Sequence, residues 1–192
     1  DLILTWERTF RRSGLPLSYS EGFNPRPVIN LAAPLPLGFT SKGEIGDFWL
    51  SETVTMDDFS SSLDQALPPG LAIRSIEVIP QLHGSKLPSL VQSAIYRMTL
   101  TKPYPELPAR IEKIMNAKTL PRIRKDKKYD LRPLIKALSI VPSEDPESTV
   151  LESKLSVLPG ATGRPEEILA ALNIPPTEAR ICREQILLKP DQ

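Results

Sequence analysis

The spacing of apolar residues in the first 80 positions alternates between that of helices and that of strands. One helical stripe opens the chain, and Gly14 is a suitable C-terminal stop for it. A second helix is predicted after Thr55, which can serve as its N-cap, and Pro68 ends it. Strands are predicted at residues 28–32, 44–50 and 71–79. The residues of the first stripe are Leu2, Ile3, Trp6 and Phe10.

The second half of the chain repeats this alternation more clearly. Residues 150–158 alternate strictly, with Leu151 and Leu155 predicted to face inward and Lys154 outward. Two prolines near strand ends are compatible with edge strands. The predicted elements are strands at 94–100, 119–126, 129–140, 150–158 and 180–188, and helices at 105–117 and 165–172.

This order of elements predicts an α+β fold made of tandem ferredoxin-like βαββαβ units. The first unit would span residues 1–80 and the second residues 94–192, with residues 81–93 as the connection. The first unit lacks an opening strand, which that topology places at the centre of its sheet. Because the chain also begins with Asp1 rather than methionine, we expect it to be truncated at its N-terminus.

Composition excludes several classes of protein. The 24 basic and 23 acidic residues nearly cancel, so any argument for a nucleic-acid partner must rest on local clusters of charge. A single cysteine excludes an internal disulfide and any multi-cysteine metal or iron–sulfur site. The sequence contains no apolar run long enough for a membrane span and no visible signal peptide. We therefore expect a cytoplasmic protein with no membrane partner, no metal and no cofactor of its own.

The first local cluster of charge joins the opening helix to a loop rich in glycine, asparagine and proline. Guanidinium groups there could converge on phosphates, and the loop aromatics could stack on unpaired bases. Two other interpretations stay open: the arginines form a solvated helix face, and the aromatics hold the loop on the core. The candidate anion-binding residues are Arg8, Arg11, Arg12, Tyr19, Phe23, Asn24 and Arg26.

The second cluster flanks a predicted hairpin tip within residues 122–132. A β-ribbon with basic residues at its tip can lie along a phosphate backbone. The alternative is a charged edge that prevents strands of different molecules from pairing. The candidate residues are Arg122, Arg124, Lys125, Lys127 and Lys128, with Tyr129 between basic residues.

Few residues suggest catalysis. Glu44 and Asp47 fall on opposite faces of a predicted strand, so they make a poor acid–base pair. His83 is the only histidine and lies in a predicted loop. Neither GxGxxG nor GxxxxGK[ST] occurs. We therefore predict no catalytic and no metal-binding residue.

Several motifs of this sequence resemble the radical SAM-linked (radical SAM-associated) protein family, a domain of unknown function. Its members occur beside, or fused behind, radical SAM proteins that carry a cobalamin-binding-like domain. They usually have one more strand ahead of the first helix, in agreement with truncation. The motifs are Trp6-Glu7-Arg8, Arg11-Arg12-Ser13-Gly14-Leu15-Pro16, Tyr19-Ser20-Glu21-Gly22-Phe23-Asn24-Pro25-Arg26-Pro27, and Pro34-Leu35-Pro36-Leu37-Gly38 followed by Gly43-Glu44.

The resemblance implies a radical SAM partner, in cis or in trans, that holds the iron–sulfur cluster, the S-adenosylmethionine and a cobalamin. Our first hypothesis is a non-catalytic substrate-recognition domain that presents RNA to this partner. The second is a protein-interaction module that docks the partner through residues 34–38. The third, by analogy with tandem ferredoxin-like endoribonucleases, is an RNA-cleaving enzyme that would depend on His83.

Overall fold

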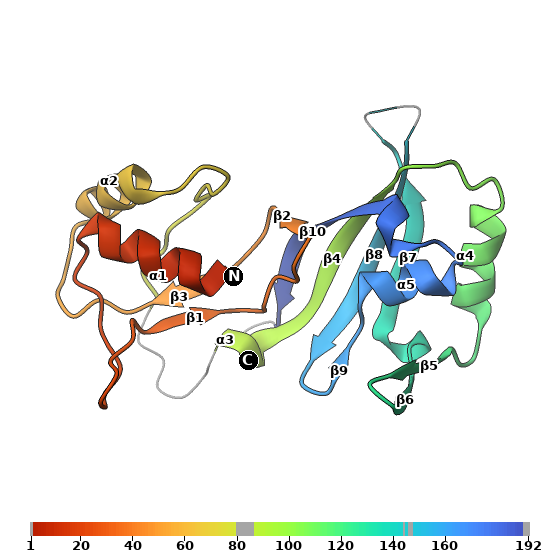
Figure 1. The fold of residues 1–192 in the computed structure, drawn as a ribbon, viewed down its shortest axis with the longest axis horizontal. Coiled ribbons are helices and arrows are strands. Elements are labelled where there is room, and N and C mark those ends of the chain that lie inside the picture. Colours follow the sequence, from red (N-terminus) through yellow and green to blue (C-terminus); the bar gives the residue numbers. More distant parts are fainter. Residues whose placement is uncertain (1, 80–86, 144, 146–147, 190–192) are drawn as a thin grey trace. The chain divides into compact units, whose positions relative to one another are not determined.

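The computed structural model describes residues 2–79, 87–143, 145 and 148–189 (Figure 1). The chain folds into two compact units, each described separately below. Unit 1 consists of residues Asp1–Leu35 and Ile45–Pro88, and unit 2 of Pro36–Glu44 and Ser89–Gln192. Helices and strands are both present in the described residues, which confirms the mixed α+β class.

Unit 2 is built on one continuous sheet. The strands run in the order β2-β10-β4-β8-β7; β2 is parallel to β10, and the other neighbours are antiparallel. A short strand β9 pairs with the end of β8. The strands are β2 (Thr40–Ser41), β4 (Val91–Leu100), β7 (Ile135–Val141), β8 (Thr149–Leu158), β9 (Ala161–Thr162) and β10 (Ala179–Leu188).

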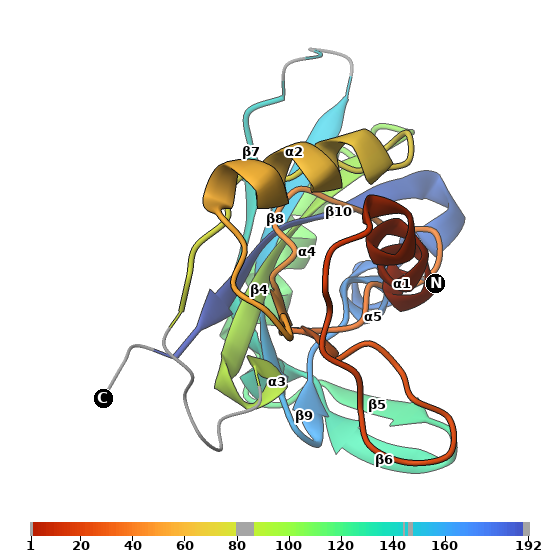
Figure 2. The same ribbon diagram turned by 90° about the vertical axis from the view of Figure 1, so that its left-hand side faces the viewer.

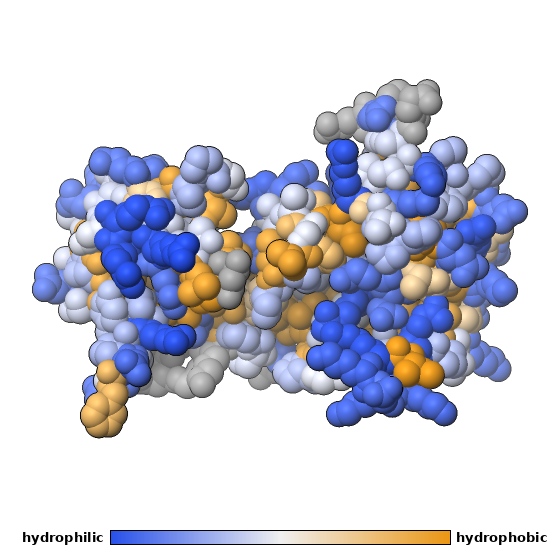
Figure 3. Space-filling model, viewed as in Figure 1, coloured by the Kyte–Doolittle hydropathy of each residue, from blue (hydrophilic) through white to orange (hydrophobic). Residues whose placement is uncertain are grey.

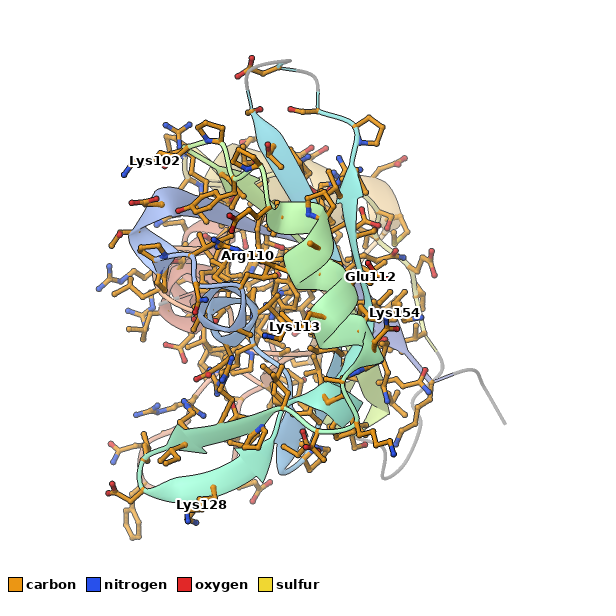
Figure 4. The ribbon with its side chains drawn as sticks, turned by 90° about the vertical axis from the view of Figure 1, so that its right-hand side faces the viewer. Lys102, Arg110, Glu112, Lys113, Lys128 and Lys154 are labelled. Carbon is orange, nitrogen blue, oxygen red and sulfur yellow. The ribbon has the colours of Figure 1, made fainter. Side chains whose placement is uncertain are left out.

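Two helices cover one face of this sheet (Figures 1 and 4). They are α4 (Leu107–Asn116), between β4 and the following strands, and α5 (Pro165–Ala171), between β8 and β10. Met98, Leu151 and Leu155 are fully buried beneath them. Alternate residues of each strand therefore meet the helices, as the alternation in residues 150–158 predicts.

A buried ion pair fastens the short strand β2 to β10. The Arg183 guanidinium donates from Nε to one oxygen of Glu44 at 2.7 Å and from an Nη to the other. Only 2% of Arg183 is exposed. Gly43 allows the close approach, because a Cβ there would lie 2.4 Å from the carbonyl oxygen of Glu184. Residues 40–44 therefore depend on contacts with residues about 140 positions later.

Unit 1 has a smaller, aromatic core. Helix α1 (Leu2–Ser13) lies beside helix α2 (Met56–Ala66), and in Figure 2 α1 is seen nearly end-on while α2 runs across the view. Strands β1 (Ile29–Leu31) and β3 (Gly46–Phe48) form a two-stranded antiparallel sheet. The Phe10 ring lies 4.5 Å from Phe48 and 5.8 Å from Trp6 between centroids. The predicted Thr55 N-cap is confirmed: its hydroxyl accepts from the Asp58 amide.

Two strand predictions need correction. Residues 71–79 contain no strand, although their composition favours one. The strand predicted at 129–140 is interrupted: β6 (Lys127–Asp130) ends, a 3-10 turn η1 (Arg132–Leu134) follows, and β7 begins. Proline at position 133 interrupts the strand, since it cannot donate to a ladder. The remaining described elements are α3 (Leu87–Leu90), η2 (Pro176–Glu178) and β5 (Pro121–Arg124).

The main sheet of unit 2 and its two helices follow one another along the chain as β4, α4, β7, β8, α5 and β10, and the β5–β6 hairpin and β9 are additional. The sequence predicts three strands between the two helices. Unit 1 has one pair of three-residue strands in its described part. The tandem arrangement of two such units therefore stays a prediction. Residues 36–44, which the prediction assigned to the first half, belong to unit 2.

Candidate nucleic-acid interface

All three arginines of α1 are exposed, and one of them, Arg12, also makes hydrogen bonds within unit 1. Arg8 and Arg11 are exposed and lie three positions apart, so they share a helix face. The ion pairs found in the described part of the chain include neither of them. They are therefore available to an anion.

Arg12 has a structural partner within unit 1. Its guanidinium donates to the carbonyl oxygen of Ala66 at 2.8 Å and to the Thr9 hydroxyl at 3.3 Å. Ala66 is the last residue of α2, and a cation at the C-terminal end of a helix is favoured by the helix dipole. A cleft of about 440 Å³ lies there, lined by Arg12, Ser13, Ser62, Gln65 and Ala66. Helices α1 and α2 both have their C-terminal ends at this cleft. The partial negative charge of the helix dipoles at those ends disfavours the binding of an anion there.

The loop between α1 and β1, residues 14–28, is a hairpin-like extension of unit 1. Its base is fixed by backbone hydrogen bonds from Ser18 to Trp49 (2.7 Å) and from Val28 to Ser18 (2.9 Å). Farther out, the Ser20 amide donates to the Arg26 carbonyl at 2.8 Å, and the Arg26 amide donates to the Ser20 hydroxyl at 3.1 Å. The loop is therefore an ordered arm rather than an open coil.

Phe23 lies at the end of this arm with its whole side chain exposed, and Tyr19 is 53% exposed. Gly22, with φ of +119°, permits the reversal beside Phe23. Phe23 therefore does not hold the loop on the core. Asn24 and Arg26 are exposed in the same arm.

The arm does not fold back over α1, as convergence of its arginine with those of the helix would require. Figures 1 and 2 both show it extending away from α1. The reason is its pairing with residues 49–51, where the amide of Ser51 also donates to the Pro16 carbonyl. Arg8 and Arg11 thus form one cationic site on unit 1, and Arg26 belongs to a separate one.

The second predicted cluster forms a two-stranded hairpin, β5–β6, whose tip is Lys125–Asp126. Both tip residues have positive φ, 47° and 62°, as a tight two-residue hairpin turn needs. The register pairs Arg122 with Tyr129 and Arg124 with Lys127. Directly opposed residues share a face, so these four side chains lie on one side of the ribbon.

One end of that face rests on helix α5. The Tyr129 hydroxyl hydrogen-bonds Glu167, and the Arg122 Nε lies 4.0 Å from a Glu167 oxygen. Burial, the negative charge of Glu167 and this hydrogen bond raise the pKa of the Tyr129 phenol. Glu167 thus compensates Arg122 and fixes the hairpin on unit 2.

The outer part of the hairpin remains cationic. Figure 3 shows hydrophilic side chains gathered over β5 and β6, and Figure 4 shows Lys128 near the tip. No ion pair of the described residues involves these outer cations, and Asp126 is the only acidic residue among them. They are Arg124, Lys125, Lys127 and Lys128, all exposed.

The structure thus divides the predicted site residues among three places: the α1 face, the arm and the hairpin. Some arginines of the basic segments have hydrogen-bond partners within the fold. Arg132, for example, donates to the carbonyl oxygens of Met115 and Ile135 and closes the end of α4. Clustering of charge in sequence does not distinguish the two kinds.

Other chemistry finds little support in the described residues. No three His, Cys, Asp or Glu side chains gather there in a way that could hold a metal ion. None of the helices in that part combines the length and apolar content that a bilayer crossing demands. His83 lies outside the described residues.

Residues 1–165 match the model of a family described as an uncharacterized protein conserved in bacteria (DUF2344). The chain belongs to this family. The matched residues include the arm and the hairpin, whereas β10 with Arg183 lies beyond them. No curated protein matches the sequence.

Proposed function

We propose that this chain is a non-catalytic accessory domain that holds RNA for a radical SAM partner. The observation that carries the proposal is the β5–β6 hairpin, whose four outer cations have no carboxylate partner among the described residues. A phosphate backbone supplies negative charge at regular spacing along such a ribbon.

The arrangement of charges at the tip of the β5–β6 hairpin favours a site that binds a ligand over an edge whose charges only prevent aggregation. Arg124 and Lys127 are directly opposite each other, and like charges in this position destabilise a hairpin. A polyanion would relieve this repulsion.

The radical SAM partner is proposed because of the sequence motifs in α1, the arm and residues 34–44. Any iron–sulfur cluster would belong to that partner, because the single cysteine here cannot supply the thiolates of a cluster. The S-adenosylmethionine and the cobalamin would likewise bind there. Co-expression with the radical SAM protein, followed by affinity purification, tests this part; failure of the two to associate contradicts it.

RNA binding is tested by fluorescence anisotropy with a structured RNA at several salt concentrations. The variant Arg124→Gln with Lys127→Gln should weaken binding and reduce the slope of log K against log salt by about 0.7–0.9 for each lost phosphate contact. A matched control removes two other exposed lysines of unit 2, Lys113→Gln with Lys154→Gln (Figure 4). Equal slopes for both variants would contradict the hairpin as the contact site.

One observation favours the second candidate, a module that docks the partner protein. Leu37, within the turn that the hydrogen bond from the Phe39 amide to the Pro36 carbonyl closes, is fully exposed. Leu37→Ser should abolish association with the radical SAM protein if this segment docks it, and should leave RNA affinity unchanged. Association unaffected by the substitution excludes this route.

A further inference from the structure

The structure restricts where this domain can stack a base. The two tryptophans, four tyrosines and five phenylalanines all lie in the described part of the chain. Tyr19 and Phe23 alone among them are exposed. The others are buried or half-buried; Tyr104 and Tyr129 hydrogen-bond Glu178 and Glu167.

The sheet of unit 2 offers no second surface on which a base could stack. Four-stranded sheets of some RNA-binding domains stack bases on aromatics of their open face. In this sheet the face opposite α4 and α5 carries Ile95, Arg97 and Thr99 from β4, and Glu152 and Lys154 from β8. Arg97 and Glu152 are themselves paired at 3.3 Å. None of these residues is aromatic, and the strands β2, β7 and β10 contain no aromatic residue, so this face offers no ring for stacking.

We propose that the arm of unit 1 is a stacking finger for unpaired nucleotides, with Phe23 as the ring that meets the base. This inference rests on the proposed RNA-holding function and names the class of RNA: single-stranded segments, loops or bulges. Bases inside a duplex are already stacked on their neighbours, so a protruding ring cannot reach their faces.

The surroundings of Phe23 favour a base over an apolar protein pocket. Ser20, Glu21, Asn24 and Arg26 are all exposed around it, so no apolar rim could exclude water from a protein contact. A base needs only one ring face, and the neighbouring amide of Asn24 can hydrogen-bond a base edge. The cross-loop hydrogen bonds hold the arm in place, which lowers the entropy lost on binding.

The test uses the full chain, a single-stranded oligouridylate and a perfectly paired RNA duplex of equal length. The oligouridylate should bind more tightly than the duplex. Phe23→Ala should weaken its binding by about 5- to 100-fold, the range expected for loss of one stacked base, without changing the salt slope. Phe23→Trp should retain affinity. Phe23→Leu, which keeps an apolar side chain but has no aromatic face, should behave as Phe23→Ala does.

Fluorescence of an oligouridylate with one central 2-aminopurine gives a second readout. Stacking should quench it with the wild-type chain and with Phe23→Trp, but not with Phe23→Ala. The inference is overturned if Phe23→Ala binds the oligouridylate as wild type does, if Phe23→Leu retains affinity, or if the duplex binds equally well. If the hairpin variant still weakens binding in those cases, the proposed function survives; if neither RNA binds the wild-type chain, the proposed function itself fails.

Discussion

Unit 2 and unit 1 differ in how far their buried surface extends. In unit 2, strands of ten residues (β4, β8 and β10) present one continuous apolar face to α4 and α5. In unit 1, two strands of three residues accompany two helices around Phe10, Leu17, Phe59 and Leu63. The exposed arm and the basic hairpin are each attached to the outside of such a core. Neither element contributes much buried area, so each can carry exposed aromatic or cationic residues at little cost to its unit.

The largest effect should come from a substitution in the buried core of each unit, made one unit at a time. Leu151 and Leu63 are both almost wholly buried, one in each unit. Replacing either with alanine should lower the free energy of unfolding by about 3 kcal/mol through lost contacts and a cavity. Hydrogen exchange should then quicken in β4, β7 and β8 for Leu151→Ala, and in α1 and α2 for Leu63→Ala. Faster exchange throughout the chain in both variants would mean that the two units unfold as one.

A similar loss should follow from breaking the buried ion pair of unit 2. Arg183→Met leaves Glu44 without its counterion and should cost about 3 kcal/mol in urea unfolding. The double variant Arg183→Met with Glu44→Gln should recover part of this loss. Arg97→Met is the matched control, because its pair with Glu152 is exposed and should change stability by less than about 1 kcal/mol. Equal losses in the two single variants would show that burial of Arg183 is unimportant.

A smaller effect should distinguish Arg12, which is hydrogen-bonded to the end of α2, from its neighbour Arg11. Arg12→Ala removes the hydrogen bond to the end of α2 and should destabilise unit 1 by about 1–2 kcal/mol. Arg11→Ala should change stability by less than about 0.5 kcal/mol. Thermal unfolding measures both. Equal melting temperatures for the two variants would remove the distinction drawn between these arginines.

The smallest effect concerns a surface cluster of unit 2. Hydrogen bonds from Lys102, first, and from Tyr104 lower the pKa of Glu178 below its ordinary 4.5. Because the folded pKa is depressed, the stabilisation is present above the unfolded pKa and is lost as pH falls through the folded pKa. Lys102→Met should raise the Glu178 pKa more than Tyr104→Phe does, as a carboxyl ¹³C titration would detect. A larger rise in Tyr104→Phe would reverse the order of causes.

The elements of unit 2 were largely predictable because their signals are local. Residues 150–158 alternate strictly, Pro165 opens α5 as expected, and Lys125–Asp126 forms the hairpin tip within the predicted basic run. Each depends on neighbours a few positions away. Strand β2 escaped prediction because its partner β10 lies about 140 residues later, and two residues carry no periodicity.

For the candidate site, the sequence predicted which residues take part, but not which of them are exposed and which have a partner in the fold. Arg11 and Arg12 are equivalent in sequence and both are exposed, yet it is Arg12 whose guanidinium donates to the Ala66 carbonyl. Likewise, Phe10 and Phe23 are chemically identical, yet one is buried and the other wholly exposed. Helical spacing correctly predicted burial of the first. Exposure of the second follows from the arm's pairing with residues 49–51, which no local pattern contains.

The sequence by itself determined the α+β class, most helices and strands, and the two regions where cations gather, because these follow from side-chain periodicity, caps and turns within short segments. Tertiary structure alone decided which cations remain unpaired, which aromatics face solvent, and that residues 36–44 join unit 2. Those outcomes depend on contacts between segments far apart in the chain, where a carbonyl, a carboxylate or a strand edge occupies one side chain and leaves its neighbour exposed.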